Sequence, residues 1–386
     1  MTILSHGRRW PGDLHYWASA LLALALVPLL RELNLPVSFD WLRLGSAYWL
    51  VLAAQSIFVA ALLYLIGIAP ATILSQLRLR IRREKIRFGL ALTFFLVLLW
   101  AFTWLKALVL TVDAVALLEF RERLKPAARR ETLLSILAPA VYLFAGFLLV
   151  FAYNDVIASL RFYGATDTAF NAMDKWLLRG YSVSDLCHWA VRRFPVSFFQ
   201  FLEFIYFGMF PQIGAALMLT AIYSGKKRAL QFVGTILTAY YLALMLFFLW
   251  PSQGPYYLCP SHFSELPASL KTYAAQKISI ANAQALWNHA RIRRISTDYY
   301  IAFPCMHIAQ PLIVMWFLRP WRRALAALAV YDLLLLGAIL LLEWHYVVDI
   351  FGGLLVAGLA IIVVNGDEPL LGSRTMKTPQ AVPSPL

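Results

Sequence analysis

Nine long apolar runs determine what this chain can fold into. A helix needs about 20 apolar residues to cross a bilayer, and these runs approach or reach that length without the alternation of barrel strands. With 61% hydrophobic and 14% charged residues, the chain cannot bury its apolar surface in one soluble globule. We predict an all-α fold, a polytopic transmembrane helix bundle. The runs span residues 14–30, 47–70, 89–111, 133–153, 199–223, 229–250, 302–318, 324–342 and 345–364.

The charge pattern predicts the orientation of the bundle. The net charge of +14 comes from 34 Lys and Arg residues spread through the loops, so positive-inside topology explains it better than nucleic-acid binding. The short basic turns 225–228 and 319–323 are expected to be cytoplasmic. We therefore expect an integral protein of a plasma or inner membrane with no nucleic-acid partner.

Two histidines are predicted to share one membrane face. His307 and His345 each lie at the start of an apolar run, and one inward turn joins the intervening spans. A helical hairpin returns the chain to its starting face, which here is the non-cytoplasmic one, together with the long connections 154–198 and 251–301.

A carboxylate lies on the same helix face as the second histidine. Asp349 follows His345 by four residues, so the two side chains can meet on a helix. Ionisable groups at membrane depth usually serve function, although a helix-end ion pair and a structural His307 are the alternatives. Two imidazoles and a carboxylate can supply a nucleophile, its orienting partner and a general acid. We interpret Glu343 as an interfacial charge rather than a second base.

The domain organisation follows from these segments. We predict N-terminal membrane segments and an amphipathic helix in residues 1–132, a core of six helices in 133–365, and a disordered tail with four prolines in 366–386. Basic stretches at 78–87 and 120–125 flank a single apolar run. Both cannot be cytoplasmic, so one of the first three segments is expected to be re-entrant or interfacial.

The cysteines and glycines indicate neither a metal nor a cofactor. Cys187, Cys259 and Cys305 show no CxxC spacing, which disfavours a structural zinc site. No G-x-x-x-x-G-K loop occurs, which disfavours a kinase or an ATP-driven transporter. The first two cysteines fall in outer loops, where they either pair and leave Cys305 free or stay as thiols.

Two short motifs resemble those of a known family. Residues 303–307, F-P-C-M-H, resemble the F-P-S-x-H motif, and residues 345–349, H-Y-V-V-D, resemble the H-Y-x-x-D motif, of the type 2 phosphatidic acid phosphatase superfamily. The branch that looks most similar contains inositol phosphorylceramide synthase and the sphingomyelin synthases. The resemblance covers residues 133–364 and implies that the six-helix core is phosphatidic-acid-phosphatase-like.

The resemblance also implies roles for the motif residues. His345 would attack phosphorus, Asp349 would orient and charge it, and His307 would protonate the leaving oxygen. A phosphohistidine would form, and its acceptor would decide the enzyme class. Water gives a phosphatase, whereas a lipid or polyol hydroxyl gives a phosphotransferase.

The chain departs from the superfamily pattern at three places. Ala338 and Ile339 stand where phosphatase members carry an S-R pair, and Cys305 replaces a serine that donates to phosphate; a thiol is a weaker donor. The K-x6-R-P motif is absent, and residues 250–257 resemble instead the proline-rich loop of the synthase branch. These departures favour transfer over hydrolysis.

Other groups must neutralise the phosphate and bind the headgroup. The outer loop is basic, and its arginines nearest in sequence to His307 are our candidates, although contact with anionic lipid headgroups would also explain them. The predicted substrate-binding residues are Arg293, Arg294, Gln253, Tyr256, Tyr257 and Cys305.

The leading hypothesis is a lipid phosphotransferase that acts through a phosphohistidine. A lipid phosphate phosphatase is the nearest alternative. A non-catalytic transporter on the same fold is a second, motivated by Cys305 and the missing arginine, and a proton-coupled channel is a third. The residues leave the donor, the acceptor and the oligomeric state open.

Overall fold

The computed structural model describes residues 165–258, 266–288 and 301–366, and isolated helical positions between 138 and 157. The predictions for 1–132, for most of the run 133–153 and for the tail beyond residue 366 lie outside these residues. So do Cys259, Arg293 and Arg294.

The described part is built from helices and loops, without a strand, as the apolar runs predicted. The helices are α7 (Ala165–Leu177), α8 (Val183–Arg193), α9 (Val196–Phe207), α10 (Met209–Leu249), α11 (Pro255–Leu258), α13 (Lys271–Trp287), α14 (Met306–Leu318), α15 (Arg322–Leu341) and α16 (Val347–Asn365). The all-α prediction is therefore confirmed.

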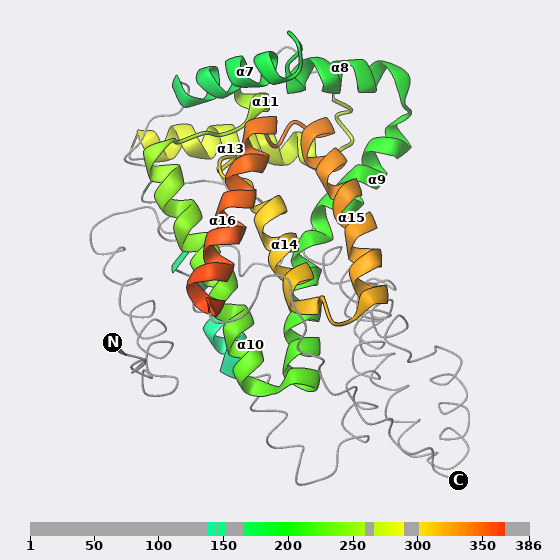
Figure 1. Cartoon of the computed structure of the whole chain (residues 1–386). Helices are drawn as coiled ribbons and strands as arrows, with labels where there is room; N and C mark the ends of the chain where they lie inside the picture. Colours follow the sequence, from blue (N-terminus) through cyan, green and yellow to red (C-terminus); the bar gives the residue numbers. More distant parts are fainter. Residues whose placement is uncertain are drawn as a thin grey trace, which may run out of the picture.

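The described residues include three helical stretches that are long and apolar enough to cross a membrane: Val196–Leu249, Arg322–Leu341 and Val347–Asn365. The first has 54 residues and contains a reversal at Gly225, whose φ of 80° interrupts α10. Figure 1 shows this helix descending, turning and rising again. This stretch contains the two predicted spans 199–223 and 229–250 and the basic turn between them. The chain is an integral membrane protein.

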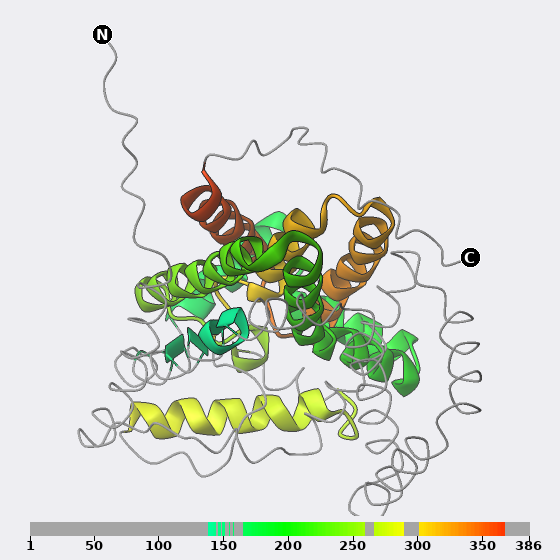
Figure 2. The same cartoon turned by 90° about the horizontal axis from the view of Figure 1, so that it is seen from below.

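The helices form an upright bundle with a cap across one end. Figure 1 shows α7 and α8 lying across the top of the upright helices. From below, α10, α14 and α16 lie together and α13 lies apart (Figure 2). Buried apolar side chains join these three helices, and the rings of Phe232 and Phe317 meet edge to face at 5.2 Å. These side chains form a close-packed core among the described residues.

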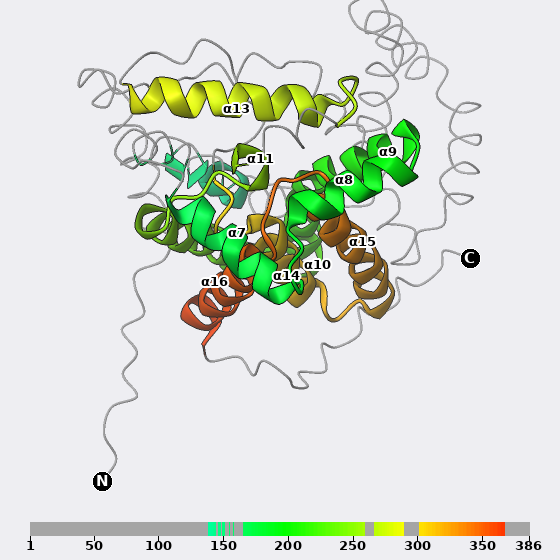
Figure 3. The same cartoon turned by 90° about the horizontal axis from the view of Figure 1, so that it is seen from above.

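The packing brings two helix starts to the capped end. α14 and α16 both begin there because α15 runs back between them, and α7 crosses above them (Figure 3). α16 carries Gly352 and Gly353 where the 303–305 loop lies against it. A Cβ on Gly353 would overlap the carbonyl oxygen of Cys305, and one on Gly352 would overlap the Phe303 ring. The absent side chains let the two motif segments touch.

We predict that Gly353→Ala lowers thermal stability in detergent by about 1–3 kcal/mol, because the added methyl group forces apart well-packed backbone. Gly358→Ala is the matched control on the same helix, since no atom of the described residues lies within 4 Å of a Cβ there. Helix propensity alone makes that change neutral or stabilising by up to about 1 kcal/mol. Equal melting temperatures for the two variants would contradict the close approach.

Candidate active site

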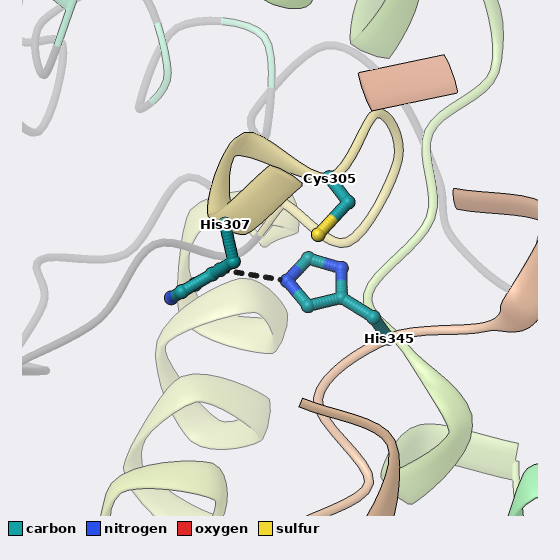
Figure 4. A group of neighbouring side chains, drawn as sticks. All are labelled: Cys305, His307 and His345. Atoms are coloured by element: carbon teal, nitrogen blue, oxygen red, sulfur yellow. Dashed lines mark hydrogen bonds between the residues drawn. The ribbon is translucent and has the colours of Figure 1, made fainter. Parts of the chain in front are cut away.

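Two histidines and an aspartate form a continuous hydrogen-bonded line. His307 lies in the first turn of α14, and its Nδ1 is 3.0 Å from Nε2 of His345. Nδ1 of His345 is 3.3 Å from Oδ2 of Asp349. His345 lies in the loop before α16 and Asp349 in the first turn of that helix, so the two side chains meet without sharing the helix face that the sequence predicted. All three side chains are buried. Figure 4 shows the two rings in contact, with Cys305 beside them.

The hydrogen bonds among His307, His345 and Asp349 determine which ring nitrogens carry protons. Asp349 accepts the Nδ1–H of His345, which leaves Nε2 facing His307, so one proton lies between the two rings. Burial disfavours the imidazolium of His345, but neighbouring Cys305 and Asp349 outweigh burial and raise its pKa. Asp349 can therefore orient this ring and stabilise its charged form.

Asp349 also connects the two motif segments. Its Oδ2 accepts the Tyr346 N–H at 2.8 Å, and its carbonyl oxygen accepts the Cys305 N–H at 3.1 Å. The second bond joins the loop before α14 to the first turn of α16. The separation between His307 and His345 is thus set by backbone contacts as well as by their own side chains.

Aromatic rings hold His307 from the other side. The Tyr206 ring stacks on His307 with centroids 4.5 Å apart and lies parallel to Trp344 at 5.4 Å. Tyr206 comes from the end of α9, far away in sequence. The stack restricts rotation of His307 relative to His345.

The proline-rich loop predicted to bind the headgroup lies between the two motif segments. Its Ser252 carbonyl accepts the Ala302 N–H at 2.9 Å. Gly254, with φ of 119°, packs so closely on the Trp344 carbonyl that a Cβ would lie 2.7 Å from that oxygen. The loop is therefore tied to the segment before His307 and to the residue before His345.

The structure describes three of the predicted headgroup residues. The Gln253 side chain is buried, and its amide has no hydrogen-bond partner among the described residues. Tyr256 is fully buried with its ring 5.5 Å from Trp344. Tyr257 is partly buried, and its pKa is raised by burial and by the charge of Asp167. Their roles in binding stay predictions, as do those of Arg293 and Arg294.

Two acids on α7 were missed by the sequence reasoning, which treated residues 154–198 as an outer connection. Asp167 is fully buried and accepts hydrogen bonds from the Ser252 hydroxyl at 2.9 Å and from the Gln253 and Gly254 N–H groups, both at 3.0 Å. The Tyr346 hydroxyl adds a fourth at 3.2 Å. One carboxylate therefore holds the proline-rich loop and the residue after His345.

The second acid, Asp174, caps the start of α16. Its carboxylate accepts the N–H groups of Val347 at 2.9 Å and Val348 at 3.1 Å, which have no partner within the helix. Asp174 and Asp167 are seven residues apart, which places them on the same face of α7. The seven-residue spacing of the two acids was visible in the sequence. Only the structure shows that this face of α7 lies against the proline-rich loop and the start of α16.

The position of Glu343 differs from the one expected from the sequence. We expected an interfacial charge, but the side chain is 0% exposed. It lies near Ser184 and Cys187 of α8, and burial raises its pKa to about 7 despite these neighbours. Whether Cys187 pairs with Cys259 stays a prediction, because Cys259 lies outside the described residues.

A cavity reaches the histidines, and an apolar groove shares one lining residue with it. The cavity, of about 40 Å³, reaches both rings and is large enough for about one water molecule. The groove, of about 400 Å³, is open and has apolar walls. Leu244 lines both. The groove is lined by Ile157, Tyr241, Leu244, Met245, Phe248 and Leu249.

We predict a pH-dependent contribution of Asp174 to stability. Burial outweighs the two N–H donors and raises its pKa from 3.8 to about 6. Between these values the folded protein holds a proton that the unfolded chain has lost, so stability falls as the pH rises through this window. Asp174→Asn carries no charge. Its melting temperature relative to the wild type should therefore rise between about pH 4 and pH 7, whereas a constant difference would contradict the assignment.

The comparisons with known proteins agree with this geometry. No curated protein and no solved structure matches the chain. Residues 183–363 match the family model of the PAP2 superfamily, and this range includes both motifs but not α7. Members of that superfamily are typically phosphatases or phosphotransferases, and the match therefore supports the interpretation of this protein as an enzyme. The match does not extend to the synthase branch. Residues 183–363, just under half of the chain, therefore resemble a PAP2 superfamily domain, and they contain His307, His345 and Asp349.

Proposed function

We propose that this protein is a lipid phosphotransferase that moves a phosphate-bearing headgroup from a lipid donor to a hydroxyl acceptor through a phosphohistidine. The observation that carries the proposal is the buried line from His307 through His345 to Asp349. It supplies an oriented nucleophile, a second titratable group at its reactive nitrogen and a carboxylate behind it.

The contact between the rings suits the first step. Transfer of the shared proton to Nδ1 of His307 frees the lone pair on Nε2 of His345. This nitrogen attacks phosphorus, the bond to the donor's alcohol oxygen breaks with its electron pair on oxygen, and His307 protonates that oxygen. Asp349 stabilises the positive charge on His345. At 3.0 Å the two nitrogens leave no space for phosphorus, so substrate binding must separate the rings.

The second step reverses the roles. The acceptor's hydroxyl oxygen attacks phosphorus, its proton passes to His307, and the N–P bond breaks with its pair returning to Nε2 of His345. Arg293 and Arg294 are the proposed neutralising groups for the phosphate oxygens. The unpaired amide of Gln253 is the proposed hydrogen-bond partner of the headgroup.

The apolar groove supports a lipid substrate. Its lining contains no charged side chain, and it shares Leu244 with the cavity at the histidines. An acyl chain lying there would bring its attached phosphate towards His345. Groove and cavity together match the amphipathic shape of a lipid with a phosphorylated headgroup.

The polarity of the bundle supports a site on the non-cytoplasmic face. The turns that follow Gly225 and Leu318 lie at the end of the bundle opposite α7 (Figure 1), and both are basic. Positive-inside topology would place those turns in the cytoplasm. The starts of α14 and α16 would then face outward.

Hydrolysis is the second candidate reaction. The cavity at the histidines has room for about one water molecule, which could accept the phosphoryl group. Transfer is favoured because Ala338 and Ile339, which replace the S-R pair, are buried among apolar side chains. They contribute no phosphate-binding charge.

The histidines should have separable effects. His345→Ala should abolish turnover and any acid-labile labelling of the protein by a ³²P-labelled phospholipid, because the nucleophile is gone. His307→Ala should slow turnover by about 10²–10⁴-fold, since it removes the general acid and base. Rapid-quench labelling and product chromatography measure both. Unchanged turnover in His345→Ala would overturn the mechanism.

The groove should govern recognition of the acyl chain. Met245 is 65% exposed, so Met245→Trp fills the groove without disturbing the core. We expect KM for a long-chain substrate to rise several-fold and KM for a short-chain, water-soluble analogue to stay unchanged. Val330→Trp, at a residue 64% exposed on α15, is the matched control. Equal effects on both substrates would count against the groove.

A further inference from the structure

We propose that Cys305, His307 and His345 form a zinc site, and that zinc bound there blocks the reaction. The inhibitory part rests on the proposed function, whereas the binding part rests on geometry alone. The sequence disfavoured a metal because its cysteines are isolated. The fold brings one of them beside two histidines that are distant in sequence.

The distances fit a single ion. The Cys305 Sγ and one ring nitrogen from each histidine all lie within 4.8 Å of one another. The closest pair of nitrogens is 3.0 Å apart. Around a tetrahedral zinc, with Zn–N of about 2.0–2.1 Å and Zn–S of about 2.3 Å, such atoms are separated by about 3.3–3.6 Å. Only small side-chain adjustments are needed. Figure 4 shows the sulfur pointing to the space beside the two rings.

The ligand chemistry also fits. A cysteine thiolate with two imidazoles is a donor set typical of zinc. The thiol of Cys305 is free and buried, and both histidines are at least nine-tenths buried. A serine at position 305 would donate to phosphate but would be a poor zinc ligand. The cysteine in place of the motif serine therefore weakens the hydrogen bond to phosphate and supplies a ligand for zinc.

Two further observations support the site. Nδ1 of His345 bonds Asp349 at 3.3 Å, which is the carboxylate–histidine–metal arrangement that orients imidazole ligands in zinc proteins. The 40 Å³ cavity that reaches both histidines provides space for a fourth ligand, a water molecule or a phosphate oxygen. Three protein ligands and an open position thus meet at one place.

Zinc and the phosphoryl group would compete for the same atoms. A metal bound to Nε2 of His345 occupies the lone pair that must attack phosphorus, and a metal on Nδ1 of His307 displaces the proton that the leaving oxygen needs. Binding releases the thiol proton and the proton shared by the rings. Zinc at this site is therefore incompatible with a phosphohistidine.

Metal binding is tested without any activity measurement. The full chain in detergent is freed of metal with a chelator and dialysed against zinc chloride. We expect one tightly bound zinc per chain in the wild type and at least about a tenfold loss of affinity in Cys305→Ser, because a ligand is missing. Cys187→Ser changes another buried cysteine and should keep the metal. Equal zinc binding by Cys305→Ser and the wild type, or equal loss in both variants, would overturn the site.

A spectroscopic measurement on the unmodified protein does not depend on how a variant folds. Cobalt(II) in place of zinc should give a thiolate-to-metal charge-transfer band together with the visible bands of a tetrahedral ion. Titration to one equivalent should saturate both. Octahedral, thiolate-free spectra would contradict the proposed ligands.

Activity then tests the inhibition. Stoichiometric zinc should abolish wild-type turnover and a chelator should restore it, whereas Cys305→Ser should resist zinc relative to its own zinc-free rate. A chain that binds zinc as described but never turns over lipid would refute the proposed function and leave the site standing. An active chain that binds no zinc would support the proposed function and refute the zinc site.

Discussion

The hydrogen bond from the Cys305 N–H to the Asp349 carbonyl oxygen, at 3.1 Å, is the contact on which the candidate site depends. It joins the starts of α14 and α16, and the two bonded residues are 44 positions apart in the chain. Gly352 and Gly353 permit it, because side chains there would collide with the 303–305 loop. Without that approach, His307 and His345 would lie at the same membrane face but not within hydrogen-bond distance.

A second set of contacts comes from outside the upright bundle. Asp167 and Asp174 of α7 accept hydrogen bonds from backbone N–H groups of the proline-rich loop and of the first turn of α16. Buried N–H groups are costly to leave unpaired. The two acids therefore stabilise the loops that border the histidines, which makes α7 part of the site's framework although it lies outside the matched superfamily range.

Cys305 connects the two proposals. As a thiol in place of serine it offers the phosphate a weaker donor, which agrees with transfer by a site that differs from that of the phosphatase members. The same sulfur beside two imidazoles makes a zinc-binding donor set. Catalysis and metal binding would therefore depend on the same three buried side chains and would exclude each other.

The sequence by itself determined the class of fold and the positions of the apolar runs 199–223, 229–250, 324–342 and 345–364, because apolar length is a local property of helices. It also paired His345 with Asp349, although His345 makes this contact from the loop before α16 and not from the helix. It also placed His307 and His345 on one face by counting spans. Only the tertiary structure decided that their rings touch, that Cys305 joins them, that Glu343 is buried and that two acids on α7 hold the neighbouring loops. Those contacts join segments tens of residues or more apart, and packing between helices, not periodicity within one, selects them.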